Sequence, residues 1–211
     1  MKKIFLFFSL LVILATLFSC SRVLSVYNWR FSLEKPEPSE TAKLSPETLS
    51  YSDDSIDITF VLGGVTEMVQ DDIIGIYASK DVEQIAFDIQ NKTDRGIKIN
   101  WDDISIIYPD GTTSRVIHSG VKLIDKSNPQ ALTIVPPNAR VNDILAPTDK
   151  ITSTSAGWQT APLFGGNDRL FWNDKEFGVF FPLEIKGEKK EYTFKFKINV
   201  LKSTPTPAKK K

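Results

Sequence analysis

Few residues of this 211-residue chain have the types and spacing that chemistry needs. Its one histidine, His118, precedes Ser119 in the run VIHSG, so the residue types of a Ser-His-Asp hydrolase are present. No Gly-x-Ser-x-Gly elbow accompanies them, and a triad is defined by geometry, which adjacency in sequence does not supply. A zinc site at His118 would need carboxylates alone to complete it. We therefore interpret His118 as a structural or surface residue, and a hydrolase is only a remote alternative.

Three aspartate pairs flank predicted strands: Asp53-Asp54, Asp71-Asp72 and Asp102-Asp103. Calcium takes six to eight oxygen ligands, but none of the pairs has the spacing of a dedicated calcium loop. A paired-carboxylate glycosidase needs two carboxylates at a defined separation, and the sequence singles out no such pair. Charged strand ends that discourage edge pairing are the better explanation. We predict no catalytic residue, no metal, no cofactor and no enzymatic activity.

The segment from Ala156 to Phe181 is the strongest candidate for binding. Its large aromatic residues are Trp158, Phe164, Phe171, Trp172, Phe177, Phe180 and Phe181. Aromatic side chains on a loop stack on sugar rings or form the buried anchors of a protein interface, but they also dominate hydrophobic cores. Three readings therefore stay open: protein contact, glycan contact, or a cap over one end of the core. We take Trp158, Phe164 and Trp172 as the candidate partner contacts.

These residues must be positioned by strands, because apolar residues alternate with polar ones along most of the chain after Asp53. The clearest pattern predicts a hairpin of 85–90 and 97–101, joined by the turn 91–96. The sequon Asn91-Lys92-Thr93 is interpreted as part of that turn and not as a glycosylation site. A second hairpin is predicted for 178–185 and 191–201. Both keep one apolar face, as strands lying on a core do.

Shorter runs with turn residues between them complete the pattern, and 148–172 is predicted to be a long loop that either has a role or has partial structure of its own. The other predicted strands are 55–62, 73–78, 104–108, 112–117, 121–124, 131–135 and 140–145. Many short strands without a convincing helix predict an all-β fold, an antiparallel immunoglobulin-like β-sandwich, with a β-barrel as the alternative.

The first twenty residues determine where this domain is located. Two lysines precede an apolar run from Ile4 to Phe18, and the run ends at the chain's one cysteine, Cys20. Leu17-Phe18-Ser19-Cys20 resembles a bacterial lipobox. The resemblance implies that residues 1–19 are a signal peptide, that Cys20 is lipidated, and that the chain is held in the bacterial cell envelope. Ser21 is not the aspartate that resembles an inner-membrane retention signal, so the outer membrane is favoured if the host has one.

The expected organisation follows from these features. Residues 20–48 are the lipidated N-terminus and a flexible tether, 49–201 the β-sandwich, and 202–211 a disordered tail. Within the tether, 22–33 forms either a strand or a segment at the lipid interface. Without the signal the chain has 24 basic and 26 acidic residues, so no global field attracts nucleic acid.

The predicted partners are the membrane, through acyl chains on Cys20, and an envelope protein of open identity. The expected function is that of a non-enzymatic interaction or scaffold module, with a carbohydrate- or small-ligand-binding lipoprotein as the alternative.

Overall fold

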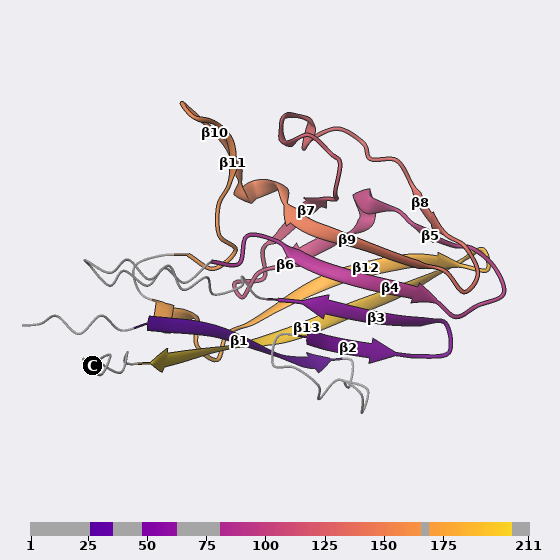
Figure 1. The fold of residues 1–211 in the computed structure, drawn as a ribbon, viewed down its shortest axis with the longest axis horizontal. Coiled ribbons are helices and arrows are strands. Elements are labelled where there is room, and N and C mark those ends of the chain that lie inside the picture. The colour runs from indigo at the N-terminus through magenta and orange to yellow at the C-terminus, as the bar shows by residue number, and fades with distance from the viewer. Residues whose placement is uncertain (1–25, 36–47, 63–80, 166–168, 204–211) are drawn as a thin grey trace, which may run out of the picture. The chain divides into compact units, whose positions relative to one another are not determined.

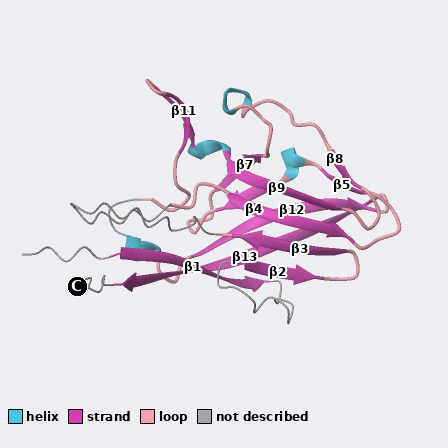
Figure 2. Cartoon of the chain, in the orientation of Figure 1, coloured by secondary structure: helices cyan, strands magenta, loops and turns pink. Residues whose placement is uncertain are grey.

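The computed structural model describes residues 26–35, 48–62, 81–165 and 169–203 (Figures 1 and 2). Cys20 with its signal, the pair Asp71-Asp72, the predicted strand 73–78 and the tail 204–211 lie outside these ranges. The unit Tyr27–Leu201 is considered by itself below. Among the described residues, no helix has the length and apolar character needed to cross a bilayer.

Eleven strands of the described residues form one hydrogen-bonded sheet, nine of them in the order β1-β13-β12-β6-β7-β9-β4-β3-β2, while β5 and β8 lie off this path, β5 pairing with β12 and β8. Their bounds are β1 (Val26–Lys35), β2 (Thr48–Ser52), β3 (Ile56–Val61), β4 (Ile85–Asn91), β5 (Ile97–Ile99), β6 (Ser105–Ile107), β7 (Thr113–Ile117), β8 (Thr133–Val135), β9 (Arg140–Pro147), β12 (Glu176–Ile185) and β13 (Glu188–Ser203). Figure 1 shows β2, β3, β4 and β9 in one layer and β12 and β13 in the other. Since β7 pairs with both β6 and β9, it links the two layers. The predicted antiparallel β-sandwich is confirmed. Because the hydrogen-bonded order continues through β7 from one layer into the other, the sandwich also resembles a partly closed barrel, which was the alternative.

Aromatic side chains from facing layers meet in the core. Phe60 of β3 lies 4.8 Å from Phe194 of β13, and Phe87 of β4 lies 5.2 Å from Phe181 of β12, measured between ring centroids. All four side chains are buried, as the alternation along their strands predicts. Edge-to-face contacts of this kind add to the free energy gained by burial. The core therefore forms from the period-two pattern of the sequence.

The last predicted hairpin is confirmed, whereas the one at 85–101 is wrong. β12 and β13 pair from Glu176↔Lys197 to Ile185↔Glu188. By contrast, β4 pairs with β3 and β9, and β5 pairs with β12 and β8. The chain between β4 and β5 therefore crosses from one layer to the other. Two strands that each have one apolar face can pair with each other in one sheet or lie in two facing sheets. The alternating apolar residues are buried in both cases, so the pattern does not distinguish them.

A short 3₁₀-helix interrupts the sheet beside β12. β12 pairs with β6 over 178–180 and with β5 over 183–185, and η2 (Trp101–Asp103) lies between β5 and β6. Pro182, which has no N–H, sits at this break and so interrupts no pairing with β5 or β6. Trp101, predicted at the end of a strand, lies in η2 with a fully buried side chain.

The alternative left open for 22–33 is a strand over the residues of β1, whereas 22–25 lie outside the described residues. β1 lies at the edge of the path beside β13, and Phe31 and Leu33 are part of the core. The sandwich therefore includes Val26–Lys35 and does not start at residue 49, so the tether predicted over 20–48 is wrong for the residues of β1. The alternation of apolar and polar residues over 26–33 indicates this strand. The charged, proline-containing stretch that follows it suggested instead that the folded domain starts later.

Of the two alternatives for the long segment 148–172, partial structure of its own is confirmed. After η4 (Thr148–Lys150), β10 (Ile151–Thr154) and β11 (Gly157–Thr160) form a separate two-stranded sheet, and η5 (Arg169–Trp172) precedes β12. The strand predicted for 121–124 is wrong, since Leu123–Asp125 form the 3₁₀-helix η3. The predicted pairing of 104–108 with 112–117 is confirmed by β6 and β7.

Candidate functional site

The three predicted contact residues occupy different environments. Trp158 of β11 is 39% exposed, Phe164 is 1% exposed, and Trp172 of η5 is half-buried. The indole Nε1 of Trp172 donates a hydrogen bond of 3.0 Å to the carbonyl oxygen of Gly165. The segment 156–181 is therefore split between the surface and the core, and no single contact surface includes all three residues.

Phe164 belongs to the cap over one end of the core, which was the competing reading of this segment. Its ring centroid lies 4.9 Å from that of Phe177, 5.6 Å from that of Trp172 and 6.0 Å from those of Trp29 and Phe31. Such a side chain is not accessible to a partner, so its predicted contact role is corrected. The sequence could not show this, because two of its neighbours come from β1, more than 130 residues earlier.

Trp158 lies on a hairpin that projects from the flank of the sandwich (Figure 1). The register is Ile151↔Thr160 to Thr154↔Gly157, and residues 152–159 are exposed on both faces. At the tip, Gly157 adopts φ 108°, a backbone conformation that side chains disfavour. An isolated two-stranded hairpin is marginally stable in water. This one must therefore be held at its base.

The base of the hairpin is fixed by a lysine and a small apolar cluster. Lys126 Nζ donates to the carbonyl oxygen of Thr148 at 2.8 Å and to that of Ile151. The Ile151 side chain is buried against Ile117 and Ala146. These contacts anchor one end of the ribbon while its outer part remains in solvent.

Trp158 does not stand alone on this surface. Lys126 Nζ lies 6.0 Å from the centroid of its ring, and η3, which carries the exposed Ile124, contacts β11. We call Trp158, Ile124 and Lys126 the hairpin platform. Sequence reasoning found Trp158 but missed Ile124 and Lys126, because the run 121–124 was read as a strand.

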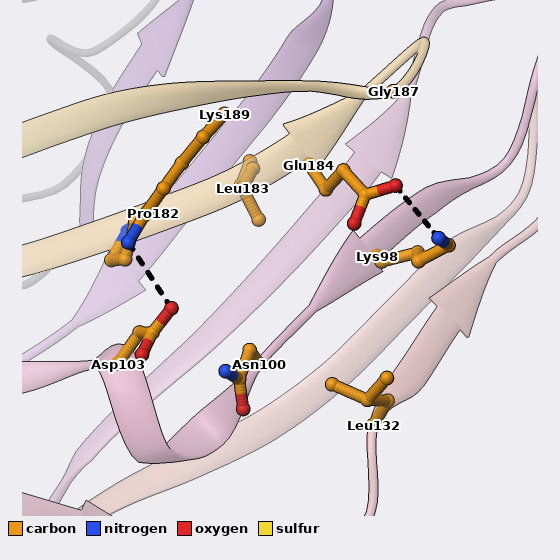
Figure 3. A pocket seen from close by; sticks show the side chains of 9 residues that line it. All are labelled: Lys98, Asn100, Asp103, Leu132, Pro182, Leu183, Glu184, Gly187 and Lys189. Carbon is orange, nitrogen blue, oxygen red and sulfur yellow. Dashed lines mark hydrogen bonds and ion pairs between the residues drawn. The ribbon is translucent and has the colours of Figure 1, made fainter.

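A cavity of about 300 Å³ lies at the break in the sheet (Figure 3). Its charged side chains are paired with one another: Lys98 Nζ lies 2.7 Å from Glu184 Oε1, and Lys189 Nζ lies 3.2 Å from Asp103 Oδ2. Asn100, Leu132, Pro182, Leu183 and Gly187 complete the lining. A polar ligand would have to compete with these ion pairs.

A second cavity, of about 370 Å³, has an aromatic wall formed by Tyr108, Phe171 and Trp172. Its remaining lining residues are Pro109, Asp110, Thr112, Asp149, Lys150, Leu163 and Lys175. The Tyr108 hydroxyl donates to Asp149 Oδ1 at 2.9 Å, and burial together with this carboxylate raises the pKa of Tyr108. The Lys150 and Lys175 ammonium groups lie 5.0 Å and 5.2 Å from the ring centroids of Tyr108 and Phe171. Here too the charged groups already have partners inside the chain.

The histidine forms a structural clamp. The His118 ring stacks on Trp101 with centroids 4.2 Å apart and an interplanar angle of 10°, and its Nδ1 lies 3.3 Å from Asp143 Oδ2. Asp143 Oδ1 accepts the backbone N–H groups of Ser119 and Ile144, each at 2.7 Å. Ser119 therefore contributes an amide and not a nucleophile. Among the hydrogen bonds of the described residues, none joins His118 to a serine or threonine hydroxyl.

The described aspartate pairs serve as turn caps and ion-pair partners. Asp53 Oδ1 accepts the backbone N–H groups of Ser55 and Ile56, as discussed below. Asp102 pairs with Arg115, and Asp103 with Lys189. In the part of the chain that the structure describes, no group of three or more histidine, cysteine, aspartate or glutamate side chains could hold a metal ion.

Comparison with models of known protein families gave no match, and comparison with curated proteins also gave none. Two solved structures are similar. One is a DUF4426 family protein from Pseudomonas aeruginosa PAO1, with 11% identity and a TM-score of 0.32, over 72% of this chain and 95% of that one. The other is an uncharacterized beta-sandwich protein from Clostridium difficile 630, with 16% identity and a TM-score of 0.24, over 68% of this chain and 88% of that one. Likenesses this weak carry no argument about function.

Proposed function

We propose that this chain is a non-enzymatic interaction module of the bacterial envelope, lipid-anchored through Cys20, which contacts an envelope protein through the hairpin platform. The observation that carries the protein contact is Trp158, an exposed indole on a ribbon that projects away from the core. The lipobox resemblance of residues 17–20 carries the anchor. The outer membrane is its location if the host has one.

Two physical arguments favour a protein contact at the platform. Tryptophan is enriched among the side chains that dominate interface energetics, since it buries a large, rigid apolar area. In addition, the ribbon contributes only Ile151 to the buried core, so stability of the sandwich does not explain its outer half. An edge of two strands with an aromatic anchor suits a flat or grooved protein surface.

The alternative class, a carbohydrate or small-ligand site, lacks a comparable observation. In the first cavity the charged side chains are paired with each other, and in the second Asp149 accepts a hydrogen bond from Tyr108 while Lys175 lies over the Phe171 ring, so a ligand would have to displace interactions that the protein already makes. We therefore place the contact at the platform and not at a cavity.

In-cell crosslinking followed by purification from native membranes tests the contact. We expect Trp158→Ala to lower the yield of a single abundant crosslinked partner at least tenfold, because interface tryptophans often contribute 2 kcal/mol or more, about a thirtyfold change in affinity. Ile134→Ala is the matched control, since Ile134 is 60% exposed but lies on β8. Equal partner yields for wild type and Trp158→Ala would refute the platform.

The anchor has a separate test. Metabolic labelling with an alkyne fatty acid should mark the wild-type chain, and Cys20→Ala should abolish both the label and the shift caused by signal removal. Labelling that persists in Cys20→Ala would show that the lipid is attached elsewhere, and a wild-type chain without label would show that it has no acyl anchor.

A further inference from the structure

One end of the sandwich carries both the beginning of β1 and an exposed aromatic tip. Figure 1 shows β1 and β13 running in opposite directions, so the start of β1 lies beside the end of β13. Near that end of β13, the backbone N–H of Asp174 donates to the carbonyl oxygen of Ile198, and the backbone N–H of Val200 donates to Asn173 Oδ1. Asn173 and Asp174, which follow η5, are therefore hydrogen-bonded to the end of β13 that lies beside the start of β1.

The tip itself consists of η5 and the lysines around it. Phe171 is 60% exposed and Leu170 is also exposed, although both belong to a segment whose next residue, Trp172, is held by Gly165 and Phe164. Lys175 Nζ lies over the Phe171 ring. Large apolar side chains next to lysines are typical of protein surfaces that enter the interfacial region of a bilayer, where the ammonium group stays with the headgroups.

The length of chain before β1 limits which surface can reach the lipid. Only five residues lie between Cys20 and Val26, and the six steps from one to the other, at about 3.3–3.6 Å each, span at most about 20 Å. β13 has 16 residues, which at about 3.3 Å each gives the sandwich a length of about 50 Å. A lipid on Cys20 would therefore keep the start of β1 within about 20 Å of the membrane, whereas the opposite end can lie farther away.

We propose that this end of the sandwich docks on the lipid surface, with Phe171 and Leu170 entering the headgroup region and Lys150 and Lys175 lying among the lipid phosphates. The proposal rests on the lipid anchor proposed above and adds an orientation to it. In this orientation the hairpin platform, on the flank of the sandwich, points parallel to the membrane surface, where a neighbouring envelope protein can contact it.

The charges around the tip specify the kind of attraction. Two carboxylates, Asp110 and Asp149, line the same cavity as Lys150 and Lys175, so the local charges balance. Docking is therefore driven by apolar insertion and by the short tether, and not by long-range attraction to anionic lipid. It should occur equally on zwitterionic and anionic vesicles and should change little with salt.

The experiment uses the full lipidated chain reconstituted in vesicles, with the fluorophore NBD on an introduced cysteine. Lipidation occupies the Cys20 thiol, so labelling is specific. Phe171→Cys reports on the tip, Leu170→Cys repeats the measurement at a second tip position, and Ile134→Cys is a control of equal exposure on β8. We expect nitroxide lipids with headgroup-level labels to quench emission at 171 and 170 at least twofold, with a blue shift, and to leave 134 unchanged.

Two results would overturn the docking. If the chain floats with the vesicles but the two tip positions are quenched no more than 134, the anchor stands and the orientation is wrong. If the chain does not float with the vesicles, the anchor itself fails, and the docking fails with it. Flotation thus separates failure of the proposed anchor from failure of this inference.

Discussion

At the scale of single residues, Asp53 shows how one carboxylate joins parts of the chain that are far apart in sequence. Its Oδ1 caps the β2–β3 turn through the N–H groups of Ser55 and Ile56, at 2.8 Å and 2.9 Å. Its Oδ2 accepts from Lys190 Nζ at 2.8 Å and from the Tyr192 hydroxyl at 2.9 Å. Burial alone would raise the pKa of Asp53, but these four hydrogen bonds together hold it below its ordinary value.

We therefore predict that Asp53→Asn lowers the free energy of unfolding by about 1–3 kcal/mol at pH 7, since hydrogen bonds to a charged group are lost. Because the folded-state pKa is lowered, this stabilisation is complete above the unfolded pKa of about 3.9 and is lost as the pH falls through the folded value. Urea unfolding from pH 7 to pH 2 measures both effects. The exposed neighbour Asp54→Asn is the control, and a variant as stable as this control would disprove the cap.

At the scale of elements, the connection from β4 to β5 depends on one buried amide. Asn91 Nδ2 donates to the carbonyl oxygens of Arg95, Val135 and Pro136, at 2.7, 2.9 and 3.1 Å. Its Oδ1 accepts both the N–H and the hydroxyl of Thr93, each at 2.8 Å. The amide thus joins the crossing to the end of β8 and the residue that follows it, through a side chain that is itself fully buried.

Replacement of this amide should be costly. We predict that Asn91→Ala lowers the free energy of unfolding by about 2–4 kcal/mol, because the hydrogen bonds of one buried amide to three carbonyl oxygens and to Thr93 are lost together. Asn142→Ala, on the exposed face of β9, should change it by less than about 0.5 kcal/mol. Thermal and urea unfolding compare the two, and equal stabilities would show that solvent replaces the Asn91 contacts.

The same crossing shows how far the sequence predicts the fold. Alternation identifies most strands and the residues that face the core, because each depends on neighbours within a few positions. It does not identify partners: the pairing of β4 with β9 and the burial of Phe164 against β1 depend on contacts between distant residues. In the same way, Trp158 is a candidate contact because of its residue type alone. Ile124 and Lys126 lie on the same surface because η3 contacts β11, and the sequence does not show that contact.

At the scale of the whole molecule, the role of β1 changes the relation between the domain and its anchor. If Cys20 carries the proposed anchor, a tether from residue 20 to 48 would let the sandwich move freely above the lipid, whereas a sandwich that includes Val26–Lys35 would be held closer to it. The orientation inferred above therefore depends on β1 being an integral strand. That requirement can be tested without any membrane.

We predict that Phe31→Ala in the chain beginning at Ser21 lowers the free energy of unfolding by about 3–5 kcal/mol, the usual cost of removing a buried phenylalanine. Phe31 lies 5.9 Å from Phe177 and 6.0 Å from Phe164, so its loss opens a cavity under the aromatic cap. Ser32→Ala changes the opposite face of β1 and should have an effect of less than about 0.5 kcal/mol. If both substitutions left urea unfolding unchanged, β1 would be a tether after all. The anchored end would then be free to turn away from the lipid.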